Sequence, residues 1–213
     1  MMDSLFPSLL GFAQAVLSIF IIVDPIGNLP LLAGLTEGVS DNKRRHVFRL
    51  AGLVGFCIIS AFALVGKYVM RDVFHISIPE FTFGGGLLLV VIGIQSVLGY
   101  SGKPTTAPGQ GLVEEEEISL AVSPIAFPLL VGPGSIVTVM LVVDRHGSLY
   151  GVAASAIAFV FVMAILHWSE LLLKLMGRIG AIALGRVFQI FIVAIGVHFI
   201  FTAVTQAFPI LLK

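Results

Sequence analysis

The stretch IIVDPIGNLP, residues 21–30, decides how this chain folds. It lies inside an apolar run that is long enough to cross a bilayer, yet it holds a carboxylate, two prolines, a glycine and an asparagine. Proline lacks an N–H donor and its ring collides with the preceding helical turn, so Pro25 and Pro30 predict that the helix opens here. In hydrocarbon, opened backbone is tolerated only where protein covers it or where it lines a cavity. A break that carries Asp24 is therefore a candidate functional site.

The composition indicates a membrane protein with several spans. Of the 213 residues, 58% are hydrophobic and 11% are charged, whereas a soluble domain carries about 25% charged residues. The 12 basic and 12 acidic residues balance, so no excess of charge points to nucleic acid as a partner. Cys57 is the only cysteine, which argues against a disulfide framework and a thiolate zinc site. The start of the chain lacks the basic region of a secretory signal, and we expect a retained first span.

Six segments reach the length of about 20 apolar residues that a membrane-spanning helix requires. They are residues 5–36 (interrupted), 47–69, 78–98, 118–143, 150–173 and 187–208. The loops after spans one, three and five hold most of the basic residues: Lys43, Arg44, Arg45, Arg49, Lys103, Lys174, Arg178 and Arg186. The other side holds Lys67, Arg71, Arg145 and Lys213. The positive-inside rule then predicts that both termini lie outside.

The chain also shows signs of an internal repeat. Residues 131–136, VGPGSI, can be laid over residues 23–28 with an offset of 108 positions, and the same offset lays the second and third spans over the fifth and sixth. A competing overlay places VSPI (122–125) on VDPI (23–26); it matches more letters but puts later helices onto loops. Chance recurrence of Gly-Pro pairs in glycine-rich helices is a further alternative.

The preferred overlay predicts an all-α membrane protein with six transmembrane helices. Three spans in each copy force the second copy to enter the membrane upside down, which gives a 3+3 inverted repeat with two broken helices. The predicted units are a first three-helix repeat (1–99), a connecting loop (100–117) and a second, inverted repeat (118–213).

The two breaks together predict a site for a zwitterion. A half-helix that begins after a break presents free N–H groups and about half a positive charge, which suits a carboxylate. Asp24 would receive an ammonium group, a sodium ion or a proton; alternatively, it only caps the following half-helix. The predicted substrate-binding residues are Asp24, Pro25, Gly27, Asn28, Pro30, Gly132, Pro133, Gly134, Ser135 and Thr138.

Other polar and small residues have structural interpretations that we prefer. Gly86 and Gly93 share a helix face and are typical of close helix packing. The Glu114–Glu117 run favours a solvated helix start, with a regulatory or cation-binding role as the alternative. His198 lies in a span and is a second candidate for a protonatable group. Glu170 and Lys174 have the spacing of an exposed ion pair.

The motifs DPIGNLP (24–30) and GPGSI (132–136), in a six-span chain of this length, resemble the MarC family. That family was named from a multiple-antibiotic-resistance locus and overlaps the small neutral amino-acid transporter family. The resemblance implies a multi-pass bacterial inner-membrane protein, distantly similar to LysE-type exporters; some relatives are described as moving glycine and other small neutral amino acids. It places Asp24, Pro25, Gly27, Asn28 and Pro30 on the first motif, and Gly132, Pro133 and Gly134 on the second. The Glu114–Glu117 run is not part of the family's pattern.

The leading hypothesis is a secondary transporter of small neutral amino acids such as glycine, alanine or serine, or of similar small solutes, by alternating access at a midplane site. The chain has no H-E-x-x-H, P-loop or G-x-S-x-G motif, so we expect no enzymatic activity, metal or cofactor, with coupling to Na⁺ or H⁺ through Asp24 left open. The expected partners are a small-molecule solute and the lipid bilayer, with a homo-oligomer left open. The alternatives are an exporter of another small metabolite and a non-transporting membrane protein that binds a partner through its cytoplasmic loops.

Overall fold

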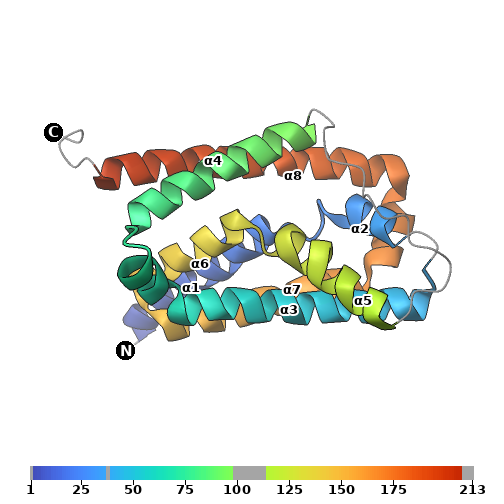
Figure 1. Cartoon of the computed structure of the whole chain (residues 1–213), viewed down its shortest axis with the longest axis horizontal. Helices are drawn as coiled ribbons and strands as arrows, with labels where there is room; N and C mark the ends of the chain where they lie inside the picture. The colour runs from blue at the N-terminus through green and yellow to red at the C-terminus, as the bar shows by residue number, and fades with distance from the viewer. Residues whose placement is uncertain (1, 37–38, 98–113, 208–213) are drawn as a thin grey trace.

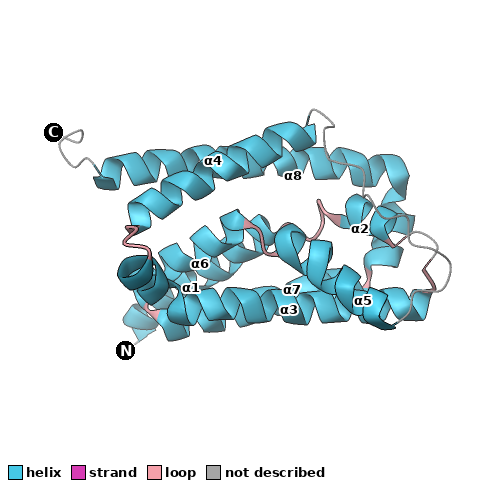
Figure 2. Ribbon diagram, in the orientation of Figure 1, coloured by secondary structure: helices cyan, strands magenta, loops and turns pink. Residues whose placement is uncertain are grey.

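The computed structural model describes residues 2–36, 39–97 and 114–207, and every regular element within them is helical. Figures 1 and 2 show these elements as an elongated bundle. The elements are α1 (Met2–Val23), α2 (Leu29–Leu35), α3 (Asp41–Tyr68), the irregular turn η1 (Val69–Val73), α4 (Ile78–Val97), α5 (Glu114–Leu120), the irregular segment η2 (Ala121–Leu130), α6 (Pro133–His146), α7 (Ser148–His167) and α8 (Ser169–Ala207). The predicted all-α class is confirmed. Most of the predicted connecting loop, up to residue 113, lies outside the described residues.

Four helices in the described ranges are long and apolar enough to cross a membrane. They are Asp41–Val73, Ile78–Gln95, Ser148–His167 and Gln189–Ala207. A fifth candidate is the pair Glu115–Leu130 and Pro133–His146, whose halves meet at 62°. Helix α1 has 22 residues and ends just before the break at Asp24; its apolar part, Leu9–Val23, is shorter than these spans.

Helices from the two halves of the chain lie beside each other. In Figure 1, α3 lies beside α7, and α4 lies beside the long second part of α8, which follows a kink at Gly177; the members of each pair run in opposite directions. The interrupted helices do the same, since α1 and α2 cross the molecule one way and α5, η2 and α6 return. The main core joins α1, α3, η2, α6 and α7 through buried side chains such as Ile19, Ile59, Val131, Met140 and Leu166.

Glycine residues allow α4 to approach α8 closely. A Cβ atom on Gly86 would lie 2.7 Å from the carbonyl oxygen of Gly196, and one on Gly196 would lie 2.8 Å from the carbonyl oxygen of Gly86. A Cβ atom on Gly93 would likewise collide with Val193. The packing interpretation of Gly86 and Gly93 is therefore confirmed.

Ion pairs join separate elements at both ends of the bundle. Lys43 Nζ lies 2.9 Å from Glu117 Oε1, and Arg44 pairs with both Asp41 and Glu170. At the other end, Lys67 Nζ lies 3.1 Å from Asp144 Oδ1. These contacts tie the beginnings of α3, α5 and α8 together at one end and α3 to α6 at the other.

Two predictions about charged residues need correction. Glu170 does not pair with Lys174: it is half-buried against the start of α3, where Arg44 reaches it, while Lys174 is exposed. The sequence predicted residues 114–117 as the end of the connecting loop 100–117, whereas Glu114–Glu117 form the first turn of helix α5. Within it, Glu115 and Glu116 are exposed as predicted for a solvated helix start, whereas Glu117 is 8% exposed and bound to Lys43.

Candidate functional site

The first helix break is built around Asp24. Helix α1 ends at Val23, and Asp24 has φ of +44°, a left-handed conformation that few residues other than glycine adopt. Its side chain is buried, with 4% of the residue exposed. The Oδ1 atom accepts the backbone N–H of Gly27 at 2.8 Å. Asp24 therefore caps the short turn that leads into α2. The N-cap position of α2 itself is Asn28, so Asp24 does not cap the half-helix directly, as the alternative from the sequence had it.

Gly27 is required for this close approach. A Cβ atom added to Gly27 would lie 2.7 Å from Cγ and 2.8 Å from Oδ1 of Asp24. Real Cβ atoms do not come that near to another heavy atom outside their own bonds. Within the DPIGN sequence, the Asp24 carboxylate can therefore cap the turn only because Gly27 has no side chain.

The second break is made from backbone and hydroxyl groups. Gly132 is extended (φ −89°, ψ 179°), and α6 begins at Pro133. Ser135 Oγ donates to the carbonyl oxygen of Gly132 at 2.9 Å, and Thr138 Oγ1 donates to the carbonyl oxygen of Gly134 at 2.8 Å. Both hydroxyl groups are buried, and each donates its hydrogen to a backbone carbonyl three or four residues earlier. Each can therefore only accept a hydrogen bond from a ligand.

The chain leaves helical geometry twice more just before this break. Ser123 (φ −138°, ψ 125°) and Phe127 (φ −134°, ψ 127°) are extended, and each precedes a proline, which disfavours the helical region for the residue before it. The chain therefore departs from helical geometry both near residues 131–136 and near residues 122–125, the two segments that the repeat overlays align with the first break. The positions of the breaks do not choose between an offset of 108 and the competing overlay on residues 122–125.

Asn28 connects the two breaks. Its Nδ2 atom lies 3.3 Å from the carbonyl oxygen of Val23 and 3.3 Å from the carbonyl oxygen of Leu129. The first carbonyl closes α1, and the second lies in the last turn of η2. One amide group thus holds the end of one interrupted helix against the end of the other.

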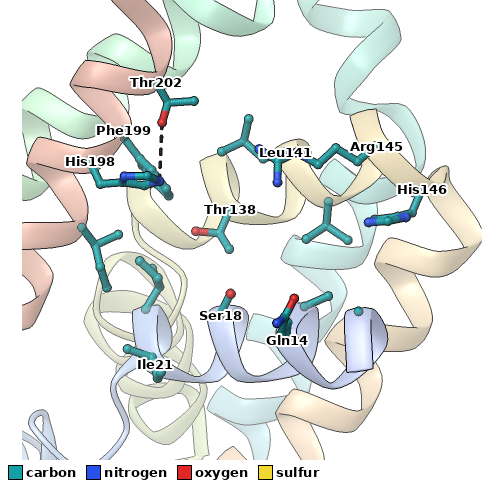
Figure 3. Close-up of a pocket in the computed structure, with 15 residues that line it drawn as sticks. Gln14, Ser18, Ile21, Thr138, Leu141, Arg145, His146, His198, Phe199 and Thr202 are labelled. Carbon is teal, nitrogen blue, oxygen red and sulfur yellow. Dashed lines mark hydrogen bonds between the residues drawn. The ribbon is translucent and has the colours of Figure 1, made fainter. Parts of the chain in front are cut away.

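A cavity of about 490 Å³ lies between α1, α6 and the second part of α8. Figure 3 shows its polar side chains converging from the three helices. They are Gln14, Ser18, Thr138, Arg145, His146, His198 and Thr202. His198 Nε2 and Thr202 Oγ1 lie 3.5 Å apart. Isoleucine residues, Ile21 and Ile22 of α1 and Ile195 of α8, line its apolar part.

The charges around the cavity are unequal. Arg145 and His146, both exposed, stand in the last turn of α6, where a cation complements the negative end of the helix dipole. No carboxylate belongs to the described lining. Asp24 comes two residues after Ile22, at the end of α1. The site therefore offers the basic side chains of Arg145 and His146 at one end and hydroxyl and amide groups along its length, while the Asp24 carboxylate lies outside its lining. No cluster of potential metal ligands occurs among the residues that the structure describes.

The predicted site residues fall into two groups. Thr138 alone lines the cavity. Asp24, Pro25, Gly27 and Asn28 form the first break, and Gly132, Pro133, Gly134 and Ser135 form the second. Gly134 packs tightly against Leu89 of α4. Pro30 stands in the first turn of α2, and its side chain lies outside the described part of the structure.

Sequence reasoning missed the cavity residues Gln14, Ser18, Arg145, His146 and Thr202. A signal for them exists, because polar residues recur at helical spacing within apolar stretches. Gln14 and Ser18 are four apart, Thr138 and Arg145 are seven apart, and His198 and Thr202 are four apart. Such spacings put each pair on one face of its helix.

Comparison with known proteins gives a consistent result. The family model described as "MarC family integral membrane protein" matches residues 9–208. A UPF0056 membrane protein of Archaeoglobus fulgidus is 32% identical over 200 residues, which cover 92% of each chain. The UPF0056 membrane protein YvbG of Bacillus subtilis is 26% identical over 92% of this chain and 94% of its own. An Aquifex aeolicus UPF0056 membrane protein is 30% identical over 89% of this chain and 90% of its own. No solved structure matches the chain.

Proposed function

The chain belongs to the MarC family of integral membrane proteins, and we propose that it is a secondary transporter of small neutral amino acids or of similar small solutes. The observation that carries this proposal is the hydrogen bond from Asn28 Nδ2 to the carbonyl oxygen of Leu129, which joins two oppositely directed, interrupted helices. Interrupted helices that meet inside a bundle are the arrangement in which many transporters form their substrate site. A 3+3 inverted repeat of six spans is the architecture that we propose for the whole chain.

The cavity beside the breaks supports a small, zwitterionic substrate. Its volume of about 490 Å³ lies within the range of about 300–1,000 Å³ that ligand pockets occupy. Arg145 and His146 complement a carboxylate, since charge-assisted hydrogen bonds to guanidinium are strong. Oxygen atoms of Gln14, Ser18 and Thr138 are acceptors for an ammonium group. These groups suit the charged ends that glycine, alanine and serine share better than they suit a purely apolar solute.

The two ends of the molecule support alternating access. At one end, the pairs Lys43–Glu117 and Arg44–Glu170 join α3 to α5 and α8. At the other end, the exposed pair Lys67–Asp144 joins α3 to α6, and the neighbouring exposed residues Arg145 and His146 belong to the cavity lining. The cavity thus extends toward the end with the fewer basic residues, which the positive-inside rule assigns to the outside of a bacterial inner membrane. In the transport cycle, the ion pairs would separate when the cavity closes outside and opens inside.

Asp24 is the proposed coupling group. It is the buried carboxylate at the break, and only its Oδ1 atom has a hydrogen bond assigned within the described residues. A buried carboxylate is stable when it is protonated or paired with a cation. Coupling to H⁺ or Na⁺ would follow if Asp24 gained or lost that partner during the cycle.

Transport in proteoliposomes tests the proposal. We expect the purified chain to move labelled glycine, alanine or serine under a Na⁺ or H⁺ gradient. Asp24→Asn preserves the shape and the acceptor for Gly27 N–H, and we expect it to lower the initial rate at least about tenfold, or about 1.4 kcal/mol in barrier height. Asp144→Asn, at an exposed aspartate, is the matched control and should change the rate less than about twofold. No transport of any of the three amino acids under either gradient would refute the substrate assignment.

The partner-binding alternative rests on the basic residues at the start of α3 and the acidic residues at the start of α5. In the structure one residue from each group binds the other, Lys43 to Glu117, which favours a structural role for both. Deleting residues 114–117 and substituting Asp24→Asn in parallel separates the two functions. The transport proposal expects the larger loss of transport from Asp24→Asn. Capture of a partner that requires residues 114–117, with transport unaffected by Asp24→Asn, would favour the alternative.

A further inference from the structure

A second pocket, of about 300 Å³, opens between α3 and α7 at the end of α7 away from the transport cavity. Its lining includes Arg45, Arg49, Val160, Met163, His167 and Trp168. We propose that this pocket binds the headgroup and the upper acyl chain of an anionic phospholipid. The proposal concerns a surface separate from the transport cavity and does not depend on any transport activity.

The described side chains leave the two arginines of the pocket without an acidic partner. Lys43 and Arg44 on the same helix have acidic partners, Glu117 for the first and Asp41 and Glu170 for the second. By contrast, within the described ranges no carboxylate lies at ion-pair distance from Arg45 or Arg49.

The position of the two arginines makes an external anion favourable. They are one turn apart on α3, so their guanidinium groups lie on the same side and repel each other. A phosphate group relieves this repulsion because it accepts paired hydrogen bonds from guanidinium.

The other wall of the pocket is apolar and belongs to a membrane-spanning helix. Val160, Met163 and His167 recur at helical spacing along one face of α7, which is a candidate span. Val160 is 66% exposed, so this wall has room for contact with an acyl chain. A free phosphate would use only the arginines, whereas a phospholipid would use both walls.

Trp168 places the pocket at the membrane surface. It follows the last residue of α7 and is 57% exposed, as is typical of the aromatic residues that lie at headgroup level. This end of the bundle also carries the larger share of basic residues. By the positive-inside rule it faces the cytoplasmic leaflet, where a basic pocket between transmembrane helices meets anionic headgroups.

Fluorescence quenching tests the proposal directly, because Trp168 is the only tryptophan in the chain. The full chain is reconstituted in phosphatidylcholine vesicles that contain a small fraction of phosphatidylglycerol with brominated acyl chains. Matched vesicles carry the same fraction of brominated phosphatidylcholine. We expect brominated phosphatidylglycerol to quench Trp168 at least about twofold more strongly, since bound lipid is enriched beside the indole. Equal quenching by the two lipids would overturn the proposal.

Variants identify the groups responsible. Arg45→Gln with Arg49→Gln should abolish the excess quenching by phosphatidylglycerol, while quenching by phosphatidylcholine stays the same and reports that the protein is still inserted. Arg45→Lys with Arg49→Lys keeps the charge and should keep most of the excess. The control Arg71→Gln with Lys174→Gln removes two exposed cations elsewhere and should have no effect. Excess quenching that survives the glutamine pair, or that inorganic phosphate displaces at the concentration of the lipid, would contradict a phospholipid site.

Discussion

The break before α2 and the break before α6 interrupt their helices by different means. At the first, a charged residue in a left-handed conformation, Asp24, caps a four-residue turn and leaves α2 only seven residues long. At the second, an extended glycine and a proline start α6, which has 14 residues, and uncharged hydroxyl groups satisfy the backbone. The first break places a carboxylate inside the bundle, and the second places only neutral dipoles there.

This difference assigns separate tasks to the two halves of the site. Helix α6 supplies much of the wall of the cavity, with Thr138, Leu141, Val142, Arg145 and His146. Helix α2 supplies none of it; it packs instead against the beginning of α8. The second half of the chain therefore forms the larger share of the cavity lining, and the first half contributes the buried carboxylate at its break. Asn28 couples the two because its side chain reaches across to η2.

The largest effect on stability is expected where the charged break has no spare room. Gly27→Ala would push a methyl group against the buried carboxylate of Asp24, and we expect a loss of about 2–3 kcal/mol in the free energy of unfolding, as for other overpacked sites. Denaturant titration in detergent micelles measures it. Gly34→Ala is the matched control, because a Cβ atom there meets no other atom within 4 Å. Equal stability of the two variants would mean that the Asp24 turn is adaptable and that the first break is no more constrained than ordinary helix.

A smaller loss is expected from cutting the link between the breaks. Asn28→Ala removes both Nδ2 hydrogen bonds and leaves the carbonyl groups of Val23 and Leu129 without that donor. Because both distances are 3.3 Å, we expect a cost of about 1–2 kcal/mol. The same titration measures the loss, with Asn42→Ala on the exposed start of α3 as a control for the residue type. If the transport rate were also unchanged, the contact between the breaks would be incidental to function.

The smallest effect is expected at the uncharged break. Ser135→Ala deletes a hydroxyl group whose acceptor, the carbonyl oxygen of Gly132, belongs to the same turn, and we expect a change of about 0.5–1 kcal/mol. Transport should fall by less than about threefold, since Ser135 does not line the cavity. Thr138→Ala deletes a similar local bond but also a cavity hydroxyl, so its effect on the apparent KM should be the larger of the two. A larger change in apparent KM for Ser135→Ala than for Thr138→Ala would indicate that the solute binds at the break and not in the cavity.

The interruptions could be predicted from residue types, while the cavity could not. Proline, glycine and an aspartate inside apolar stretches act on their own backbone within a few residues, and local rules cover such effects. The wall of the cavity instead combines Ser18, Thr138 and His198 from three helices that are far apart in the chain. Polar residues at helical spacing identify the polar face of each helix. The local sequence does not determine which of these faces pack toward one another.

The same distinction applies to the charged residues. Spacing along a helix predicted a pair between Glu170 and Lys174, yet Glu170 binds Arg44 because the start of α8 lies near the start of α3. Glu117 was grouped with its exposed neighbours, and only the packing of α5 against α3 brings Lys43 to it.

The sequence by itself determined the all-helical class, the membrane character, the family and the positions of both breaks, since these follow from composition and from conformational limits of single residues. Only the tertiary structure decided that Asn28 joins the breaks, that α1, α6 and α8 enclose the cavity, and that Arg45 and Arg49 line a pocket between α3 and α7. The physical reason is that hydrogen bonds, cavities and ion pairs depend on distances between helices, and those distances are set by how the complete bundle packs.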